Sequence, residues 1–296
     1  MKILLAADGS EYSDLAAKFL TRLNLSLEDE ITILHVISWV PFEYDRESYY
    51  ESLKQIKIEI APKILDTALD ILKPVSARIS TAILDGAPDK YIIDFAVDSN
   101  IDLIVMGARG LKGIKLFALG SVTRSVAINS PKPVLVIRQS PWEEEGKMRI
   151  LFATDGSDHA NATVNLLNFI PFPDDTEITI FNVIRSVLSD IPERFVMEIN
   201  DRIKEVVSRG RAMEFAESEK IIEQARRYLI KRFPKINLLT KFGDPSTEIL
   251  NEAEVLKADV IALGSRGLRG IKGMMGSVSR NILGQSKSSV LIGKIG

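Results

Sequence analysis

Short apolar runs alternate with amphipathic stretches along the whole chain. The runs are rich in Ile, Val and Leu and hardly alternate with polar residues, which is typical of strands buried on both faces of a parallel sheet. In the first half they cover residues 3–7, 31–37, 79–84, 103–106 and 134–137. Between them, residues 14–23 and 89–98 have the apolar spacing of helices. This alternation predicts an open α/β sheet with right-handed crossover connections.

The second half of the chain repeats the motif order of the first. "KILLAADGSEYSDLAAKFL" begins at Lys2 and "RILFATDGSDHANATVNLL" at Arg149. Likewise "DGAP" at Asp85 corresponds to "FGDP" at Phe242. Duplication and fusion explain this order. We therefore expect two similar doubly wound open sheets, each of five mostly parallel strands with helices on both faces. The predicted domains are residues 1–140 and 149–296, with a linker at 141–148 where Pro, Gly and a Glu run interrupt the pattern.

Two segments allow more than one interpretation. Most of a net ten-residue insertion in the second half falls within residues 192–233, which are dense in Arg, Lys and Glu. A long solvated amphipathic helix, interrupted at Gly210, is the favoured interpretation, and a lid or partner-binding helix is the alternative. Residues 39–50 hold five aromatic side chains and are either an interaction patch or local packing over a sheet edge.

Composition narrows the class of protein. The 296 residues are 46% hydrophobic and 26% charged, with a net charge of −2, so no overall attraction to nucleic acid or to an anionic membrane is expected. The absence of cysteine excludes disulfides and thiolate metal sites, and the two histidines, His35 and His159, lack zinc-binding spacing. The start "MKILLAADGS" is too short for a signal peptide. We expect a cytoplasmic protein without nucleic-acid or membrane partners.

A glycine-rich basic loop follows the fourth apolar run. "GARGLKGIKLFALGSV" contains Gly107, Gly110, Gly120 and Ser121 in the spacing G-x2-G-x9-G-S. In open α/β folds, ligands bind beyond the carboxyl ends of the strands. Glycines let backbone amides approach a phosphate, and Ser121, as the expected N-cap, opens a helix over residues 122–129. Four cationic side chains lie in or beside the loop: Arg109, Lys112, Lys115 and Arg124. The spacing alone leaves open a phosphate site or a glycine turn with solvated basic residues; it matches neither the P-loop nor the dinucleotide fingerprint.

Asp8 and Asp155 close the first apolar run of each half, in "ADGS" and "TDGS". A carboxylate at this edge could accept a hydrogen bond from a ribose hydroxyl, or hold Mg²⁺ beside phosphates, with Asp8 as the candidate metal ligand. The alternative is a turn or helix-start residue whose side chain caps the backbone.

These motifs together resemble the universal stress protein family. The resemblance rests on "KILLAADGS", "ITILHVI", "DLIVMGARG" and "GSVTRSVAINSPKPVLVI" and runs through nearly all of both halves, as in tandem members. It implies the adenine-nucleotide alpha hydrolase-like fold with ATP or AMP at the carboxyl edge of the sheet. By position, Ala6, Ala7, Asp8 and Val36 would contact adenine and ribose. The loop positions Met106, Gly107, Arg109, Gly110, Gly120, Ser121 and Val122 would hold the remainder, chiefly phosphates. The last strand, residues 133–137, is the family's dimerisation strand. Here it could pair with Ser289–Gly293 in an intrachain pseudo-dimer, and a further homodimer is left open.

The second half departs from this pattern at one point. The resemblance places its nucleotide contacts at Ala153, Thr154, Asp155, Val183, Leu263, Gly264, Arg266, Gly267, Gly276, Ser277 and Val278. Between Gly267 and Gly276 lie eight residues, whereas nine separate Gly110 from Gly120. In a helical segment, the loss of one residue turns the downstream chain by about 100° and shifts it by about 1.5 Å, which could misplace Ser277. The alternative is that the loop absorbs the loss, because Asp155, Val183, Gly264, Arg266 and Gly267 are all kept. We therefore expect a full site in the first half and a weaker or altered one in the second.

The residues support three functional hypotheses. The first is an adenine-nucleotide-binding stress or signalling protein, in which bound ATP or AMP biases conformation or the binding of an unknown protein partner. The second is a slow Mg²⁺-dependent ATPase, with Asp8 holding the metal and Arg109 or Arg124 stabilising developing charge. No residue is evident to activate water, because His35 is expected to pack within a strand. The third is a scaffold with vestigial loops that acts through its helices and its last strands.

Overall fold

The computed structural model describes residues 1–38, 47–111, 119–138, 147–185, 201–268 and 274–295. Its strands are β1 Lys2–Ala6, β2 Glu30–Ile37, β3 Arg78–Asp85, β4 Leu103–Gly107, β5 Val134–Ile137, β6 Arg149–Ala153, β7 Glu177–Ile184, β8 Lys235–Phe242, β9 Val260–Gly264 and β10 Ser289–Gly293. Its helices are α1 Glu11–Thr21, α2 Glu47–Leu72, α3 Pro88–Asp98, α4 Ser121–Asn129, α5 Asp158–Phe169, α7 Asp201–Leu229, α8 Pro245–Val255 and α9 Ser277–Gln285. In the first half, every expected strand is present, with ends that differ by at most one residue.

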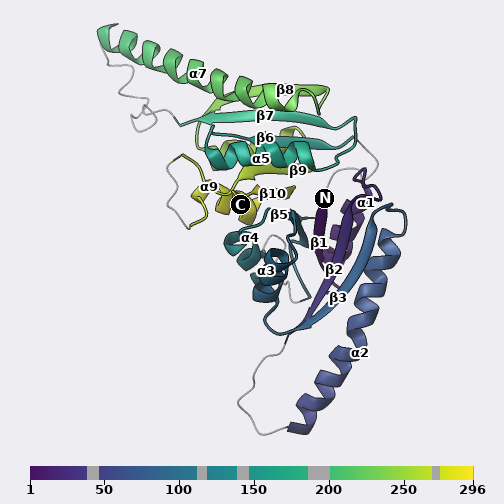
Figure 1. The fold of residues 1–296 in the computed structure, drawn as a ribbon. Coiled ribbons are helices and arrows are strands. Elements are labelled where there is room, and N and C mark those ends of the chain that lie inside the picture. Colours follow the sequence, from purple (N-terminus) through teal and green to yellow (C-terminus); the bar gives the residue numbers. More distant parts are fainter. Residues whose placement is uncertain (39–46, 112–118, 139–146, 186–200, 269–273, 296) are drawn as a thin grey trace.

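The described strands form one ten-stranded sheet in the order β3-β2-β1-β4-β5-β10-β9-β6-β7-β8 (Figure 1). All pairings inside each half are parallel. The two five-stranded units join through β5 and β10, which pair antiparallel with Leu135 opposite Leu291. The expected pairing of the last two strands is thus observed. Because the joining pair is antiparallel, the strands of the two halves run in opposite directions. The carboxyl ends of the strands in one half therefore lie at the same edge of the sheet as the amino ends in the other half.

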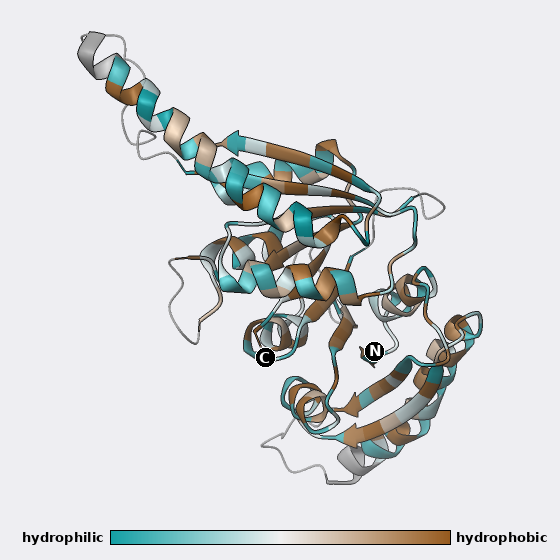
Figure 2. Cartoon of the chain, turned by 45° about the horizontal axis from the view of Figure 1, so that its top comes forward, coloured by the Kyte–Doolittle hydropathy of each residue, from teal (hydrophilic) through white to brown (hydrophobic). Residues whose placement is uncertain are grey.

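Helices cover both faces of the sheet and bury one apolar cluster on each. Residues of α1, α2, α5 and α7 pack against one face, and residues of α3, α4, α8 and α9 pack against the other. Each cluster continues across both halves, because the pseudo-twofold relation at β5 and β10 keeps equivalent helices on the same face. Figure 2 shows mostly apolar strands between helices of mixed polarity. The predicted α/β class with helices on both faces is confirmed.

The outermost strands are less buried than expected. The run at residues 79–84 was expected to be buried on both faces, yet the side chain of Ile83 in β3 is 42% exposed. At the other end of the sheet, Leu238 in β8 is 46% exposed. The prediction is wrong for these strands because each has a neighbouring strand on one side only and lies at the margin of its helical layers.

Within the segment 192–233, the long helix α7 covers Asp201–Leu229, and residues 192–200 lie outside the described residues. Asp201–Leu229 runs through Gly210 as one helix, so the expected interruption there is wrong. A glycine inside a helix destabilises it by only about 1 kcal/mol relative to alanine, and the flanking helical turns can offset this loss. Near its end, Ile222 and Leu229 are buried against the sheet, whereas Met213 is 74% exposed, which fits a largely solvated amphipathic helix. The long helices α2 and α7 lie at the two outer ends of the molecule (Figure 1).

Some expectations fall outside the described residues. Residues 39–46 contain most of the aromatic segment, so neither of its interpretations is tested. Residues 139–146 contain most of the proposed linker, and the domain boundaries stay a prediction. The described helices include none that is long and apolar enough to cross a membrane.

Candidate functional site

The first candidate site lies where β1 and β4 end. Asp8 follows β1, and two hydrogen bonds orient it: the amide of Ser10 donates to its Oδ1 at 3.0 Å, and the Ser10 hydroxyl donates to the same oxygen at 2.6 Å. Its other oxygen, Oδ2, occupies the space that a Cβ on Gly110 would need. The side chain that caps α1 belongs to Ser10, which accepts a hydrogen bond from the amide of Ser13. Asp8 therefore uses one oxygen in a turn and directs the other at the glycine loop.

The glycine loop is held against the end of β4 by close packing. A Cβ on Gly107 would lie 2.6 Å from the carbonyl carbon and oxygen of Tyr12, so only glycine fits there. The amide of Gly120 donates to the carbonyl of Ala108 at 2.9 Å, and the Thr123 hydroxyl donates to the carbonyl of Gly107 at 2.8 Å. These two bonds fix where α4 begins relative to the strand.

The expected N-cap is wrong by one residue. Gly120 is the N-cap of α4, with extended backbone angles of φ −61° and ψ 149°, and Ser121 is the first helical residue. Glycine has no side-chain oxygen, and within the described residues no side chain caps this helix. The first amides of a helix lack intrahelical acceptors and carry its positive dipole end. The start of α4 is therefore suited to an anion, and Ser121 is exposed there.

Two arginines of the first half lie close to each other at this edge. The Arg109 guanidinium stacks over the Tyr12 ring, 5.3 Å from its centroid. Arg138 directly follows β5 and is buried; its Nη2 donates to the carbonyl of Leu283 at 2.7 Å, and its Nε has no partner among the described residues. Burial, and then repulsion by Arg109, lowers the pKa of Arg138 to about 10. An anion beside these two groups would relieve that repulsion.

The second half rebuilds the same geometry with equivalent residues. The amide of Ser157 donates to Oδ1 of Asp155 at 3.1 Å, and Oδ2 of Asp155 lies where a Cβ on Gly267 would stand. That oxygen also accepts the amide of Leu268 at 2.9 Å. A Cβ on Gly264 would lie 2.7 Å from the carbonyl carbon of His159, as its counterpart does against Tyr12.

The shorter second loop does not displace the helix after it. The amide of Gly276 donates to the carbonyl of Ser265 at 2.9 Å, and the Ser279 hydroxyl donates to the carbonyl of Gly264 at 2.7 Å. Gly276 has φ −62° and ψ 154°, close to the values of Gly120. Of the two alternatives, the loop therefore absorbs the lost residue, and the start of α9 is neither turned nor shifted. Between the glycines, residues 112–118 and 269–273, which include Lys112 and Lys115, lie outside the described residues.

The remaining predicted contacts lie at the ends of three strands and at the start of one helix in each half. The amide of Ala7 donates to the carbonyl of Leu34 at 2.9 Å, and His35 places its Nδ1 2.8 Å from the carbonyl of Ala7. His35 is thus packed within β2, as expected. In the second half, the amide of Thr154 bonds to Phe181 in the same way, and Asn182 donates to the carbonyl of Thr154 at 2.7 Å. By strand position, the structure brings the predicted residues of each half together at one edge: Ala6, Val36, Met106 and Val122 in the first, and Ala153, Val183, Leu263 and Val278 in the second.

Sequence reasoning missed the basic residue that follows the last strand of each half. Lys294 is the counterpart of Arg138, and its Nζ donates to the carbonyls of Ala127 at 2.9 Å and Ile128 at 3.2 Å. Burial, and then Arg266, lowers the pKa of Lys294 to about 8. Each cation thus reaches across the seam to the C-terminal end of the other half's helix, α9 for Arg138 and α4 for Lys294, where a positive charge is favourable. The repeat "VLVIR" and "VLIGK" carried the signal, because a basic residue stands at the same position in both.

A metal ion would find few protein ligands here. Within the described residues, no group of three or more His, Asp or Glu side chains could hold one. Asp8 offers a single carboxylate oxygen toward the loop, so Mg²⁺ would depend mainly on ligand phosphates and water.

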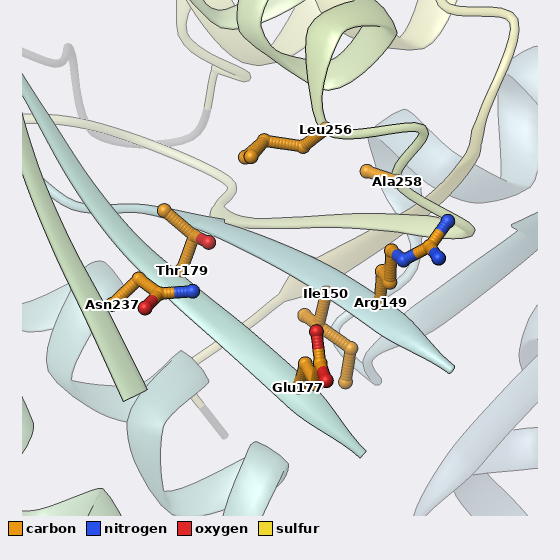
Figure 3. Close-up of a pocket in the computed structure, with 7 residues that line it drawn as sticks. All are labelled: Arg149, Ile150, Glu177, Thr179, Asn237, Leu256 and Ala258. Carbon is orange, nitrogen blue, oxygen red and sulfur yellow. The ribbon is translucent and has the colours of Figure 1, made fainter. Parts of the chain in front are cut away.

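A separate small cavity of about 110 Å³ lies at the opposite edge of the second half (Figure 3). It is lined by Arg149, Ile150, Glu177, Thr179, Asn237, Leu256 and Ala258. Arg149 and Glu177 begin β6 and β7, so the cavity is at the amino edge of these strands. It does not belong to the candidate site, which lies at the carboxyl edge.

The fold and the two loops define a class: a tandem of two doubly wound α/β units, each with a glycine loop at the carboxyl ends of its strands. The family model of the universal stress proteins matches residues 1–138 and, a second time, residues 147–294. The chain therefore belongs to the universal stress protein family.

Relatives agree with this assignment. A universal stress protein of Methanocaldococcus jannaschii is 31% identical over 143 residues, which cover 48% of this chain and 84% of that protein. One from Mycolicibacterium smegmatis is 23% identical over 300 residues, with 98% and 96% of the two chains covered. The crystal structure of a universal stress protein from Archaeoglobus fulgidus covers 100% of this chain and 98% of its own, with 22% identity and a TM-score of 0.66, and so shares the tandem fold.

Proposed function

We propose that this universal stress protein binds an adenine nucleotide, ATP or AMP, at the carboxyl edge of each half and acts as a stress-response or signalling module. One observation carries the proposal. In each half, the backbone of a loop arginine lies against the glycine N-cap of a helix, and a second, buried cation lies near enough to this arginine for the two charges to repel. Such an arrangement favours a polyanion with phosphate geometry.

The rest of the edge fits a nucleoside. Asp8 directs Oδ2 toward the loop, where a carboxylate can accept hydrogen bonds from ribose hydroxyls. Ala7 and Val36 lie at the ends of adjacent strands and offer main-chain groups and apolar surface for a planar base. Arg109 and the amides of α4 would then hold the phosphates. Bound Mg²⁺ would shield the phosphate charge while Asp8 orients the nucleotide.

The test counts nucleotides on the full chain and removes one site at a time. Native mass spectrometry with added AMP or ATP should show up to two nucleotides per chain. Gly110→Ala should remove the first, because the added Cβ would displace the Asp8 carboxylate. A loss of affinity on the order of 100-fold is expected, equivalent to about 3 kcal/mol.

Gly210→Ala is the matched control, because a Cβ there meets nothing within 4 Å in α7. Its nucleotide count should equal that of the unmodified chain. An unchanged count in Gly110→Ala contradicts the assigned site. A folded chain that binds no nucleotide would favour a scaffold that acts through its helices.

A further inference from the structure

The second site contains a histidine where the first has a tyrosine. His159 and Tyr12 occupy equivalent places in the first turn of α5 and α1, each against the glycine that ends the neighbouring strand. A phenol stays neutral over the physiological pH range, whereas an imidazole can change its charge there. The two halves therefore place groups of different acid–base chemistry beside the same loop.

A serine of the loop holds the imidazole in place. The hydroxyl of Ser265 lies 3.0 Å from Nδ1 of His159. The equivalent residue of the first loop, Ala108, has no hydroxyl. Ser265 is buried, and its carbonyl accepts the amide of Gly276, the N-cap of α9. His159 is thus attached to the residue that fixes the helix N-terminus, and across the described part of the chain its Nε2 has no hydrogen-bond partner.

The charges around His159 come from every element packed against it. Arg266 follows β9 and Lys294 follows β10, while Asp158 begins α5 and Asp155 follows β6. Burial, and then the two cations, lowers the pKa of His159, and the two carboxylates oppose this effect. Asp155 already accepts two backbone amides, from Ser157 and Leu268. The two cations and the two carboxylates balance in formal charge, so burial is the main reason that the folded chain disfavours a proton on this imidazole.

We propose that the second site is a proton-linked anion site: a phosphate-bearing ligand bound at the start of α9 brings a proton onto His159, so that this half, unlike the first, binds more tightly as the pH falls. The inference rests on the proposed nucleotide binding and adds a regulatory property to one of its two sites. A phosphate near Arg266 and Lys294 would offset their repulsion and attract an imidazolium. The Nδ1 proton would be donated to Ser265, and Nε2 would be left to donate toward the anion.

The first experiment follows the imidazoles directly in the full chain by NMR titration. The sequence has only two histidines, His35 and His159, and the variant His159→Tyr identifies their signals. The chain should carry Gly110→Ala, so that added AMP occupies the second half. AMP is expected to raise the titration midpoint of His159 by about one pH unit or more.

The second experiment measures proton uptake by isothermal titration calorimetry. Heats of AMP binding near pH 6.5 in two buffers of different ionisation enthalpy should show uptake of up to about one proton, and the affinity should rise up to about tenfold per unit fall in pH relative to His159→Tyr. His159→Tyr, which installs the first half's residue, should abolish this difference, and at low pH its affinity for AMP should be lower than that of the parent chain. Proton uptake by AMP's own phosphate contributes equally in both chains, so the comparison with the variant subtracts it.

Each result separates this inference from the proposed function. If AMP binds the Gly110→Ala chain and the His159 midpoint does not move, the inference fails and nucleotide binding stands. If AMP binds only when Gly110 is intact, the second half is not a site and the inference again fails. If AMP binds neither half of the unmodified chain, both fail together. The signal that is lost in His35→Asn also assigns the two histidines, so the NMR measurement decides the question even if His159→Tyr does not fold.

Discussion

The two halves of this chain keep one loop geometry in two different surroundings. In both, the amide of the N-cap glycine donates to the carbonyl of the residue that follows β4 or β9. In both, a hydroxyl, from Thr123 or Ser279, donates to the carbonyl of the last residue of that strand. These contacts survive the one-residue deletion in the second loop. The surroundings change instead: Ala108 beside Tyr12 corresponds to Ser265 beside His159. Short-range backbone bonds therefore preserve the helix start, while the neighbouring side chains set the chemistry of each site.

The same comparison holds in the core, where changes occur in compensating pairs. At the end of the last strand, Ile137 corresponds to Gly293, and in the facing helices Ala16 corresponds to Thr163. A Cβ on Gly293 would collide with the hydroxyl of Thr163 and lie 3.0 Å from its Cα. A large strand residue with a small helix residue in one half is replaced by the reverse in the other. The larger side chain thus moves from the strand in the first half to the helix in the second, and the combined side-chain volume of the pair is smaller there.

Gly293→Ile tests this exchange and should have the largest effect. It copies the first half's residue into a place filled by Thr163, and overpacking of this kind costs about 1–3 kcal/mol. Urea unfolding monitored by circular dichroism measures the loss. Adding Thr163→Ala should restore part of it, but not all, because the α5 backbone remains too close. Additive losses in the double variant would show that the two positions are not coupled.

Lys294 should make stability depend on pH in a window that the first half lacks. The pKa of Lys294 is about 8 when folded, against 10.5 for an ordinary lysine. Between these values the unfolded chain binds more protons, so the free energy of unfolding rises with pH. From pH 8 to 9.5, the unmodified chain should gain about 2 kcal/mol relative to Lys294→Met. Urea unfolding at several pH values measures the difference. A free energy of unfolding that changes equally with pH in the two chains would rule out that burial lowers the pKa of Lys294.

His35→Asn should have the smallest effect, because it copies the residue that does the same work in the second half. Asn182 already donates to the carbonyl of Thr154, as His35 bonds to that of Ala7. We expect a change below about 1 kcal/mol, the net worth of one hydrogen bond. His35→Ala leaves the Ala7 carbonyl without this partner and should cost more. Thermal unfolding of both variants makes the comparison, and equal losses would mean that Asn cannot replace the imidazole here.

Much of the fold was determined by the sequence alone. Apolar runs without alternation predicted the strands, and the repeat predicted two similar units. These features are local or repeated, so periodicity and comparison of the halves are enough to find them. The joining through the last strands was implied only by the resemblance to the family. The positions of the loop glycines were also evident, and the structure explains two of them: Gly107 touches the Tyr12 backbone, and Gly110 faces Asp8.

The details of capping and exposure needed the structure. Ser121 looked like an N-cap because the residue type suits that position, but the backbone becomes helical one residue earlier and the cap is Gly120. The exposure of Ile83 depends on β3 being the edge of the whole sheet. Residue type cannot decide either point, because each depends on the position of a neighbour.

The contacts that distinguish the two sites were decided by tertiary structure only. Arg138 reaches Leu283 over 145 residues of chain, Lys294 reaches Ala127 over 167, and His159 meets Ser265 over 106. Each pair is brought together by the strand order and by the antiparallel joining of β5 and β10. The sequence determined where a phosphate loop could form in each half, because glycine spacing and strand ends are local properties. Tertiary structure decided which cations and which imidazole lie beside each loop, because those side chains meet only after the two units have folded and joined.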